Sequence, residues 1–200
     1  MPSRADRPAR ERILEAAMDL FGRQGYRATT IAQIEQAAGL SGGAGGLYRH
    51  FASKRALLEE GLDSQVQAGP DLADFLQPAD VGRDTSLPQR LLGVARAGLR
   101  RLQCERDLNR MLLRDLADHP DLLARVRDSE LRRVHAGLTT WLQAQTADES
   151  VDVPALAAVL MAAVSHYWIM TDVFDEHPLQ VSEDRFLAAL AEAAARAIAG

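Results

Sequence analysis

The residues with the clearest chemical potential lie between positions 39 and 54, in the stretch GLSGGAGGLYRHFASK. Its five glycines are followed by Tyr48, Arg49, His50 and then Lys54. Glycine-rich backbone and cationic side chains both bind phosphate, in nucleotides or in nucleic acids. A P-loop is excluded, because its last glycine precedes Lys and then Ser or Thr, whereas Gly46 precedes Leu47. A dinucleotide fingerprint is excluded as well, since no strand pattern comes before the glycines.

Charge is distributed unevenly along the chain. The formal net charge is −5, but residues 1–60 hold nine Arg or Lys against seven Asp or Glu. No acidic residue lies between Glu35 and Glu59, while Arg49, Lys54 and Arg55 do, with His50 beside Arg49. This interval predicts a local positive stripe of the kind that binds nucleic acid. A solvated basic helix face without a ligand is the alternative.

Helical periodicity supplies elements that would position this stretch. Apolar residues recur at helical spacing from Ile13 to Phe21 and predict a helix over residues 8–24 that stops at Gly25. Thr30 and Gln33 match a capping box, so a second, short helix starts there and ends at Gly39.

A third helix is predicted over residues 44–51. Leu47 and Phe51 are four residues apart, so both would face a small core, while Tyr48, Arg49 and His50 would point outward. Ser53 is placed to cap a fourth helix whose inner face carries leucines 57, 58 and 62. The result is a helix, a tight turn and a helix, with basic and aromatic residues on the outside.

The stretch GYRATTIAQIEQAAGLSGGAGGLYRHFASKRALL resembles the DNA-binding domain of the TetR (tetracycline-repressor) family of bacterial transcription regulators. The resemblance covers roughly residues 9–58. It implies that the third helix lies in the major groove of DNA, with Tyr48, His50, Lys54 and Thr30 on phosphate oxygens. Base reading would fall to the positions around Arg49, whose guanidinium can bind guanine O6 and N7. The predicted DNA-contacting residues are Thr30, Ser41, Gly45, Gly46, Leu47, Tyr48, Arg49, His50 and Lys54.

One departure from the family pattern concerns the turn. Ser41 and Tyr48 are seven residues apart, where the usual turn leaves five, so two extra residues lie in or beside it. Glycine costs about 1 kcal/mol relative to alanine at each helical position, so Gly45 and Gly46 should leave the reading helix loose until DNA orders it. We predict that Gly46→Ala stiffens the free domain but weakens operator binding through lost close approach.

After a segment rich in Gly, Pro and Asp between residues 68 and 90, helical periodicity returns over residues 90–104, 106–117, 122–145, 154–174 and 182–199. No strand signal appears, so the prediction is an all-α protein. A three-helix helix-turn-helix domain (residues 1–56) would precede a helical effector-binding and dimerisation domain (residues 57–200).

Two sets of residues are singled out in the second domain. Apolar stripes in the last two helices predict a bundle seam, which the resemblance implies is a homodimer interface; burial within one chain is the alternative. This set is Leu156, Leu160, Ala163, Tyr167, Leu187, Leu190 and Ala194. A small-molecule effector pocket, also implied by the resemblance, would use adaptable and aromatic side chains. These candidates are Met111, His135, Trp141, Met161, Tyr167 and Trp168.

The expected function is therefore a ligand-responsive transcriptional regulator, in the family's usual mode a repressor, that binds a palindromic operator as a homodimer. No catalytic or metal-binding constellation is visible, so we expect no enzyme, no metal and no cofactor. The longest apolar run, residues 155–164, is too short for a membrane span, and a single cysteine suits a reducing compartment. We expect a cytoplasmic protein, associated with the nucleoid when bound to DNA. The alternative is a helical ligand-binding or interaction adaptor that has lost operator binding.

Overall fold

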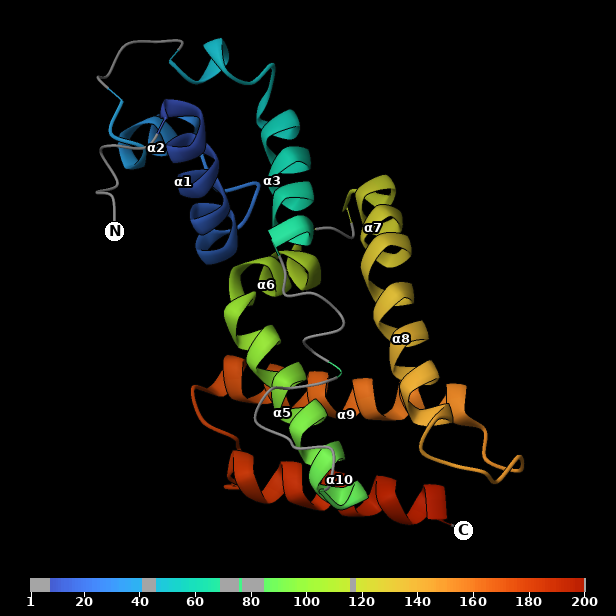
Figure 1. Cartoon of the computed structure of the whole chain (residues 1–200). Helices are drawn as coiled ribbons and strands as arrows, with labels where there is room; N and C mark the ends of the chain where they lie inside the picture. The colour runs from blue at the N-terminus through green and yellow to red at the C-terminus, as the bar shows by residue number, and fades with distance from the viewer. Residues whose placement is uncertain (1–7, 41–45, 69–75, 77–84, 116–117, 200) are drawn as a thin grey trace. The chain divides into compact units, whose positions relative to one another are not determined.

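The computed structural model describes residues 8–40, 46–68, 76, 85–115 and 118–199 (Figure 1). These described residues form helices and no strand, so the predicted all-α class is confirmed. The chain divides into two compact units, one from residues 1–69 and 105–127 and one from residues 70–104 and 128–200. The first unit therefore takes in two helices that follow residue 104, in addition to the predicted helix-turn-helix. The functional boundary after residue 56 stays a prediction.

The first unit opens with α1 (Ala9–Gln24) and α2 (Ile31–Ala37), close to the predicted bounds. The capping box at α2 is confirmed: Thr30 Oγ1 accepts from Gln33 N at 3.3 Å, and Gln33 Oε1 accepts from Thr30 N at 2.8 Å. Gly39 has a φ of +67°, the left-handed conformation expected of the residue that ends this helix.

Four further elements complete the first unit. They are a 3₁₀ helix η2 (Leu47–Arg49), α3 (Lys54–Ala68), α6 (Arg106–Arg114) and α7 (Pro120–Val126). Ser53 Oγ accepts from Ala56 N at 2.9 Å, so the predicted cap of α3 is confirmed. The helix predicted over 106–117 ends earlier, at Arg114, where Asp115 N donates back to Met111 O at 2.8 Å.

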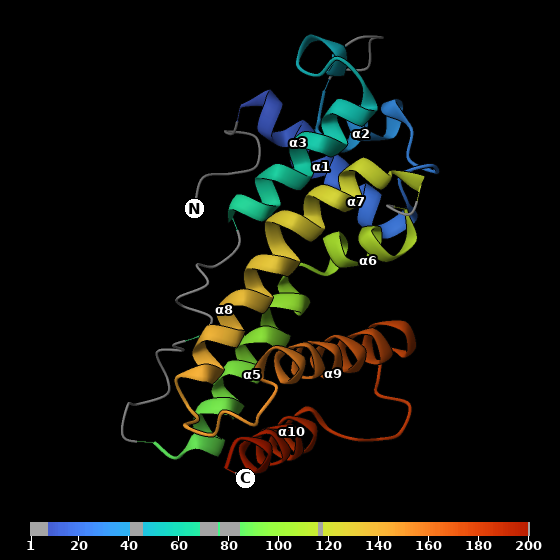
Figure 2. The same cartoon turned by 90° about the vertical axis from the view of Figure 1, so that its right-hand side faces the viewer.

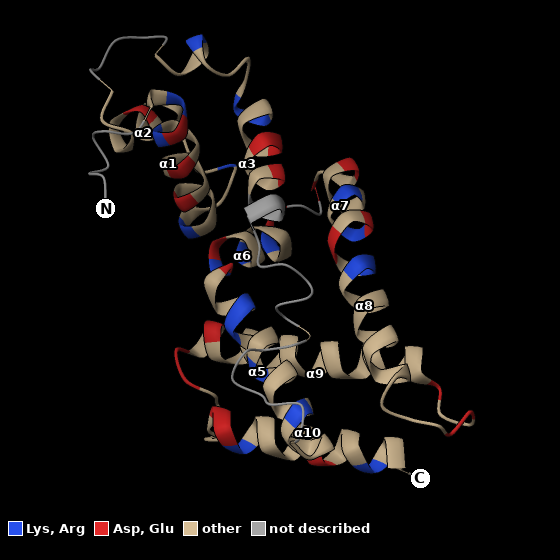
Figure 3. Cartoon of the chain, viewed as in Figure 1, with Lys and Arg blue, Asp and Glu red and all other residues tan. Residues whose placement is uncertain are grey.

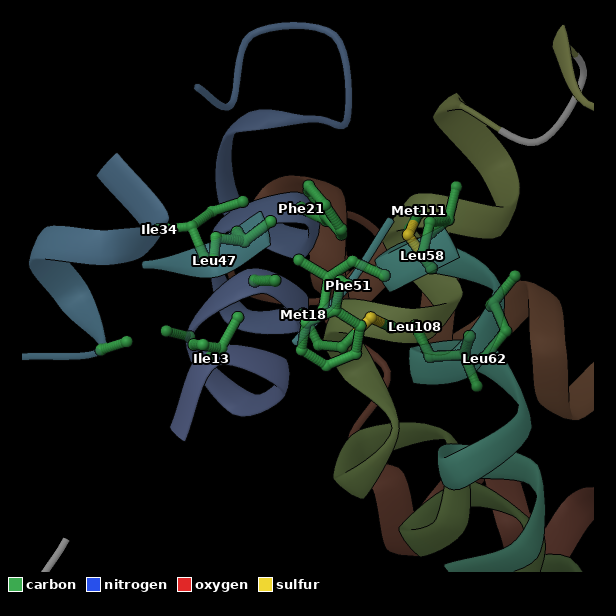
Figure 4. Close-up of a cluster of buried hydrophobic side chains, with 14 of the residues drawn as sticks. Ile13, Met18, Phe21, Ile34, Leu47, Phe51, Leu58, Leu62, Leu108 and Met111 are labelled. Carbon is green, nitrogen blue, oxygen red and sulfur yellow. The ribbon is translucent and has the colours of Figure 1, made fainter. Parts of the chain in front are cut away.

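All six elements of the first unit contribute to one apolar core (Figure 4). Phe21, Leu58 and Met111 are fully buried, and they come from α1, α3 and α6. The glycine at position 22 lets α1 and α6 approach closely, because a Cβ there would lie 2.2 Å from the Cβ of Asp107. Helix α6 is thus part of the framework that holds the helix-turn-helix.

The second unit contains α5 (Leu87–Cys104), α8 (Arg132–Gln143), α9 (Val153–Phe174) and α10 (Glu183–Ala199). Within it, α9 and α10 run side by side and cross α5 (Figures 1 and 2). Two apolar clusters hold these helices together, one at α5, α8, α9 and α10 and one at α5, α9 and α10.

The segment predicted to be helical over residues 122–145 is helical over residues 120–143, but it is not a regular α-helix throughout. A π-helical segment η4 (Arg127–Leu131) separates α7 from α8. Within the second unit, Glu130 of this segment is buried and its carboxylate accepts from Arg101 Nη2 at 2.7 Å. Apolar periodicity does not reveal such a segment, because one extra residue in a turn depends on a tertiary contact made elsewhere.

Candidate nucleic-acid interface

The predicted reading helix over residues 44–51 differs from the structure. Gly46 has helical dihedral angles, Leu47–Arg49 form one turn of 3₁₀ helix, and His50 N donates to Leu47 O at 2.9 Å. Residues 41–45, which include the predicted contacts Ser41 and Gly45, lie outside the described residues. A short 3₁₀ turn fits the glycine-rich sequence, because each glycine makes an α-helix less favourable.

The inner side of this segment is anchored as predicted. Leu47 and Phe51 are 0% and 4% exposed and join the same core as Ile34. Leu47 N also donates to the side chain of Glu35 in α2, with Oε1 at 2.8 Å. The sequence alone did not single out Glu35. Its carboxylate accepts from an amide twelve residues further along the chain, and a contact over that separation leaves no periodic signal.

The outer side of the segment presents the predicted contact residues to solvent. Tyr48 is 56% exposed, and Arg49 and His50 are exposed as well. The turn therefore presents three polar groups in succession: the phenol of Tyr48, the guanidinium of Arg49 and the imidazole of His50. Leu47 and Phe51 of the same turn are buried. Such a turn can donate several hydrogen bonds to phosphates or to base edges at once.

Thr30 lies at the exposed start of α2, where its side chain is already engaged in the capping box. Lys54 lies at the start of α3, half-buried, with its Nζ 4.3 Å from the ring centroid of Tyr26. Burial lowers the pKa of Lys54, and the nearby carboxylate of Asp115 opposes this shift. In this conformation the Lys54 ammonium therefore packs on an aromatic ring of its own unit.

The cations of the predicted positive stripe differ in their partners. Arg49 and His50 are exposed, whereas Arg55 bonds to Glu59 Oε1 at 2.9 Å and also pairs with Asp121 of α7. Glu59, one helical turn away, and Asp121, distant in sequence, thus neutralise one of the three cations in the interval. Figure 3 shows acidic and basic residues interspersed along α1, α3 and α7.

The predicted dimer-interface residues divide into two groups in the second unit. Tyr167, Leu187 and Ala194 are buried in the apolar clusters of the chain itself. The other four are half-buried: Leu156, Leu160, Ala163 and Leu190. The large apolar side chains of α9 that are exposed are other residues: Val159 (60%), Val173 (64%) and Phe174 (55%).

The predicted effector-pocket residues are distributed over three apolar clusters. Met111 is buried in the core of the first unit. Trp141 and Met161 pack on one cluster of the second unit, and Tyr167 and Trp168 belong to the other. His135 Nε2 donates to the carbonyl oxygen of Pro154, 2.9 Å away, and so joins α8 to α9.

Helix α9 is long and apolar enough to cross a membrane by length and composition, with 28% of its most apolar stretch buried in the described structure. Figure 3 shows it almost without charged residues. A core helix of a soluble protein passes the same test, so this is weak evidence for a span. Among the described residues, no group of three or more His, Cys, Asp or Glu could hold a metal ion.

Residues 13–60 match the sequence model described as "Bacterial regulatory proteins, tetR family". The chain is 30% identical over 122 residues to an uncharacterised HTH-type transcriptional regulator, YvkB of Bacillus subtilis. That alignment covers 61% of this chain and 60% of YvkB. The HTH-type transcriptional repressor KstR2 of Rhodococcus jostii is 43% identical over 51 residues, which is 26% of this chain and 24% of KstR2. The chain thus spans less than two thirds of the length of these relatives.

A solved structure shares the fold. It is a putative TetR-family transcriptional regulator from Mesorhizobium loti, with a TM-score of 0.70 and 20% sequence identity, covering 99% of this chain and 97% of the other. The family match lies on the segment that carries Glu35, Leu47 and Tyr48, and the helices beyond it have the same arrangement as in that structure. Residues 13–60 of the chain are therefore similar to the TetR family of bacterial regulatory proteins, and the chain shares the fold of a TetR-family structure.

Proposed function

We propose that this protein is a ligand-responsive transcriptional regulator, acting as a repressor, and not an enzyme. The observation that carries the proposal is the turn at residues 46–51, where Leu47 and Phe51 are buried and Tyr48, Arg49 and His50 are exposed. The relatives are named as transcriptional regulators and repressors, which agrees with this reading of the turn. We place the protein in the cytoplasm, on the nucleoid when it is bound to DNA.

Arg49 is the proposed base-reading residue, and Tyr48, His50, Thr30 and Lys54 are the proposed phosphate contacts. Arg49 carries the one long donor side chain of the exposed turn, and a bidentate contact to guanine is worth about 1–3 kcal/mol of discrimination. For Lys54 to reach a phosphate, its ammonium has to leave the ring of Tyr26.

The test is selection of binding sites from random DNA, at two salt concentrations, with the wild-type protein and Arg49→Ala. The matched control is Arg23→Ala, which removes another exposed arginine of the first unit, one that bonds to Asp19 within α1. We expect an enriched palindrome, weaker binding at high salt, and loss of preference at one guanine in Arg49→Ala alone. No enrichment by the wild-type protein would contradict the proposal and favour an adaptor that has lost operator binding.

We propose further that the operator is palindromic because the protein is a homodimer that pairs through the second unit. The exposed apolar face of α9 supports this, since the residues that the structure describes leave Val159 and Val173 as exposed hydrophobic surface. Val159→Glu should convert the dimer to a monomer in sedimentation velocity. Gln143→Glu, at an exposed position at the end of α8, should not.

The second unit is also the proposed site of the small-molecule effector, around Trp141 and Met161 or around Tyr167 and Trp168. Both tryptophans of the chain belong to this unit, so quenching of their fluorescence reports ligand binding there. A ligand that changes tryptophan emission and releases the selected operator would support the effector role. A ligand that changes emission but leaves operator affinity unchanged would contradict it.

A further inference from the structure

Acidic residues just after α6 and at the start of α7 lie against cations of the helix-turn-helix, all within the first unit. Asp118 Oδ2 lies 3.1 Å from Arg27 Nη2, and Asp121 pairs with Arg55. Asp115, which is 8% exposed, acts electrostatically on Lys54. We call Asp115, Asp118 and Asp121 the acidic corner.

The histidine directly before α7 strengthens the contact with Arg55. Arg55 Nη1 lies 3.1 Å from His119 Nδ1, and a guanidinium has no acceptor, so the imidazole nitrogen must accept. The His119 ring meets the Tyr26 ring edge-on, with centroids 5.2 Å apart. Tyr26 in turn lies under the Lys54 ammonium, so the corner and the start of α3 form one connected network.

The two arginines of this network lie next to the proposed phosphate contacts. Arg27 precedes Thr30 by three residues, and Arg55 directly follows Lys54. Both side chains remain accessible: the Arg27 and Asp118 side chains are 79% and 52% exposed, and those of Arg55 and Asp121 are 41% and 60% exposed. Exposed ion pairs contribute little to stability, and a guanidinium binds phosphate through two hydrogen bonds, so DNA phosphate can compete for both arginines.

We propose that Arg27 and Arg55 are further phosphate-binding residues, and that Asp118 and Asp121 compete with DNA for them. The inference rests on the proposed DNA-binding function. In the free protein the acidic corner keeps both arginines paired internally, and this lowers the affinity for any DNA sequence. The corner thereby limits non-specific binding, because only an operator that also satisfies Arg49 offsets the loss of the internal ion pairs.

The experiment measures affinity for the selected operator against salt concentration with the full chain, comparing wild type and Asp118→Asn/Asp121→Asn. The control Asp19→Asn/Asp63→Asn removes the same charge and also breaks two ion pairs of the first unit, with Arg23 and Arg125. We expect the corner variant to bind several-fold more tightly. The slope of log affinity against log salt should become steeper by about 0.9 for Arg27, and by less for Arg55, which still bonds to Glu59. The control should stay close to wild type.

Adding Arg27→Ala and Arg55→Ala to the corner variant should abolish its gain in operator affinity. The same two changes in the wild-type protein should lower operator affinity by a smaller factor. Circular dichroism checks that each variant is folded. The same comparison is repeated for a single ion pair with Asp118→Asn, Arg27→Ala and the two changes combined. Equal affinities of the corner and control variants, or a gain that survives loss of the arginines, would overturn the inference. If wild type selects no DNA, the proposed function has failed, and this inference fails with it.

Discussion

The contacts that stabilise one compact unit of this chain differ in kind from those that stabilise the other. The first unit has one apolar core surrounded by exposed ion pairs that join its elements, such as Arg55 with Asp121 and Arg125 with Asp63. The second unit has two apolar clusters and a buried ion pair, Arg101 with Glu130, whose side chains are both 11% exposed. Its helix α9 carries almost no charge (Figure 3).

This difference corresponds to the role that we propose for each unit. A DNA-binding unit needs many cations, and internal carboxylates limit their mutual repulsion when no DNA is bound. A unit that pairs with a second copy or encloses an apolar ligand needs apolar surface, and a buried ion pair can be retained in it to specify one arrangement of helices. The following predictions test whether the units differ in this way, beginning with the largest expected effect.

Phe21→Ala should break the first unit while leaving the second unit largely intact. Phe21 is fully buried, so its truncation should lower the free energy of unfolding by about 3–5 kcal/mol. Both tryptophans lie in the second unit, so urea unfolding followed by circular dichroism should shift, while unfolding followed by tryptophan fluorescence should shift much less. Equal shifts by both probes would show that the units unfold as one.

Glu130→Gln should destabilise the second unit through charge. It removes the carboxylate charge that pairs with Arg101 and also with Arg133, and removing one partner of a largely buried ion pair costs about 3 kcal/mol. Tryptophan fluorescence during urea unfolding measures this loss. The control is Asp184→Asn, because Asp184 pairs with Arg96 but is 85% exposed, and its loss should cost less than about 1 kcal/mol. Similar losses of stability in both variants would mean that the buried pair of Glu130 stabilises the unit no more than an exposed pair does.

Gly46→Ala should raise the stability of the first unit and lower its affinity for DNA. The backbone at Gly46 has φ −56°, which alanine adopts readily, so the free protein should gain up to about 1 kcal/mol. The new Cβ would lie 3.2 Å from Leu40 Cδ1, which must shift slightly. Operator affinity should nevertheless fall, as measured by fluorescence anisotropy. Equal or tighter binding would refute the close-approach role of this glycine.

Asp107→Asn should give the smallest effect, and one that depends on pH. Burial, with a further contribution from the Asp19 carboxylate, raises the pKa of Asp107 above its ordinary value of 3.8. The ionised form therefore disfavours the folded state at neutral pH, and this cost disappears as the pH falls through the raised pKa. The variant should have a higher urea midpoint than wild type at neutral pH and the same midpoint in acid. A difference in urea midpoint that grows as the pH falls would contradict this prediction.

Local signals in the sequence predicted most of the helices. The capping box at Thr30 and Gln33, the left-handed Gly39 and the cap at Ser53 all depend on residues close together in the chain, and all three are confirmed. The burial of Leu47 and Phe51 and the exposure of Tyr48 follow from spacing on a single turn. The sequence did not predict the π segment at Glu130, the end of α6 at Arg114 or the pairing of Arg55 with Asp121.

The sequence by itself determined the all-α class and the exposed turn that carries Arg49, because periodicity and capping are local. Only the tertiary structure decided that α6 and α7 pack with the helix-turn-helix, that Glu35 holds Leu47 N, and that the acidic corner faces Arg27 and Arg55. The physical reason is that ion pairs and buried hydrogen bonds join residues at any separation in sequence. Their partners are set by how the helices pack and not by spacing along the chain.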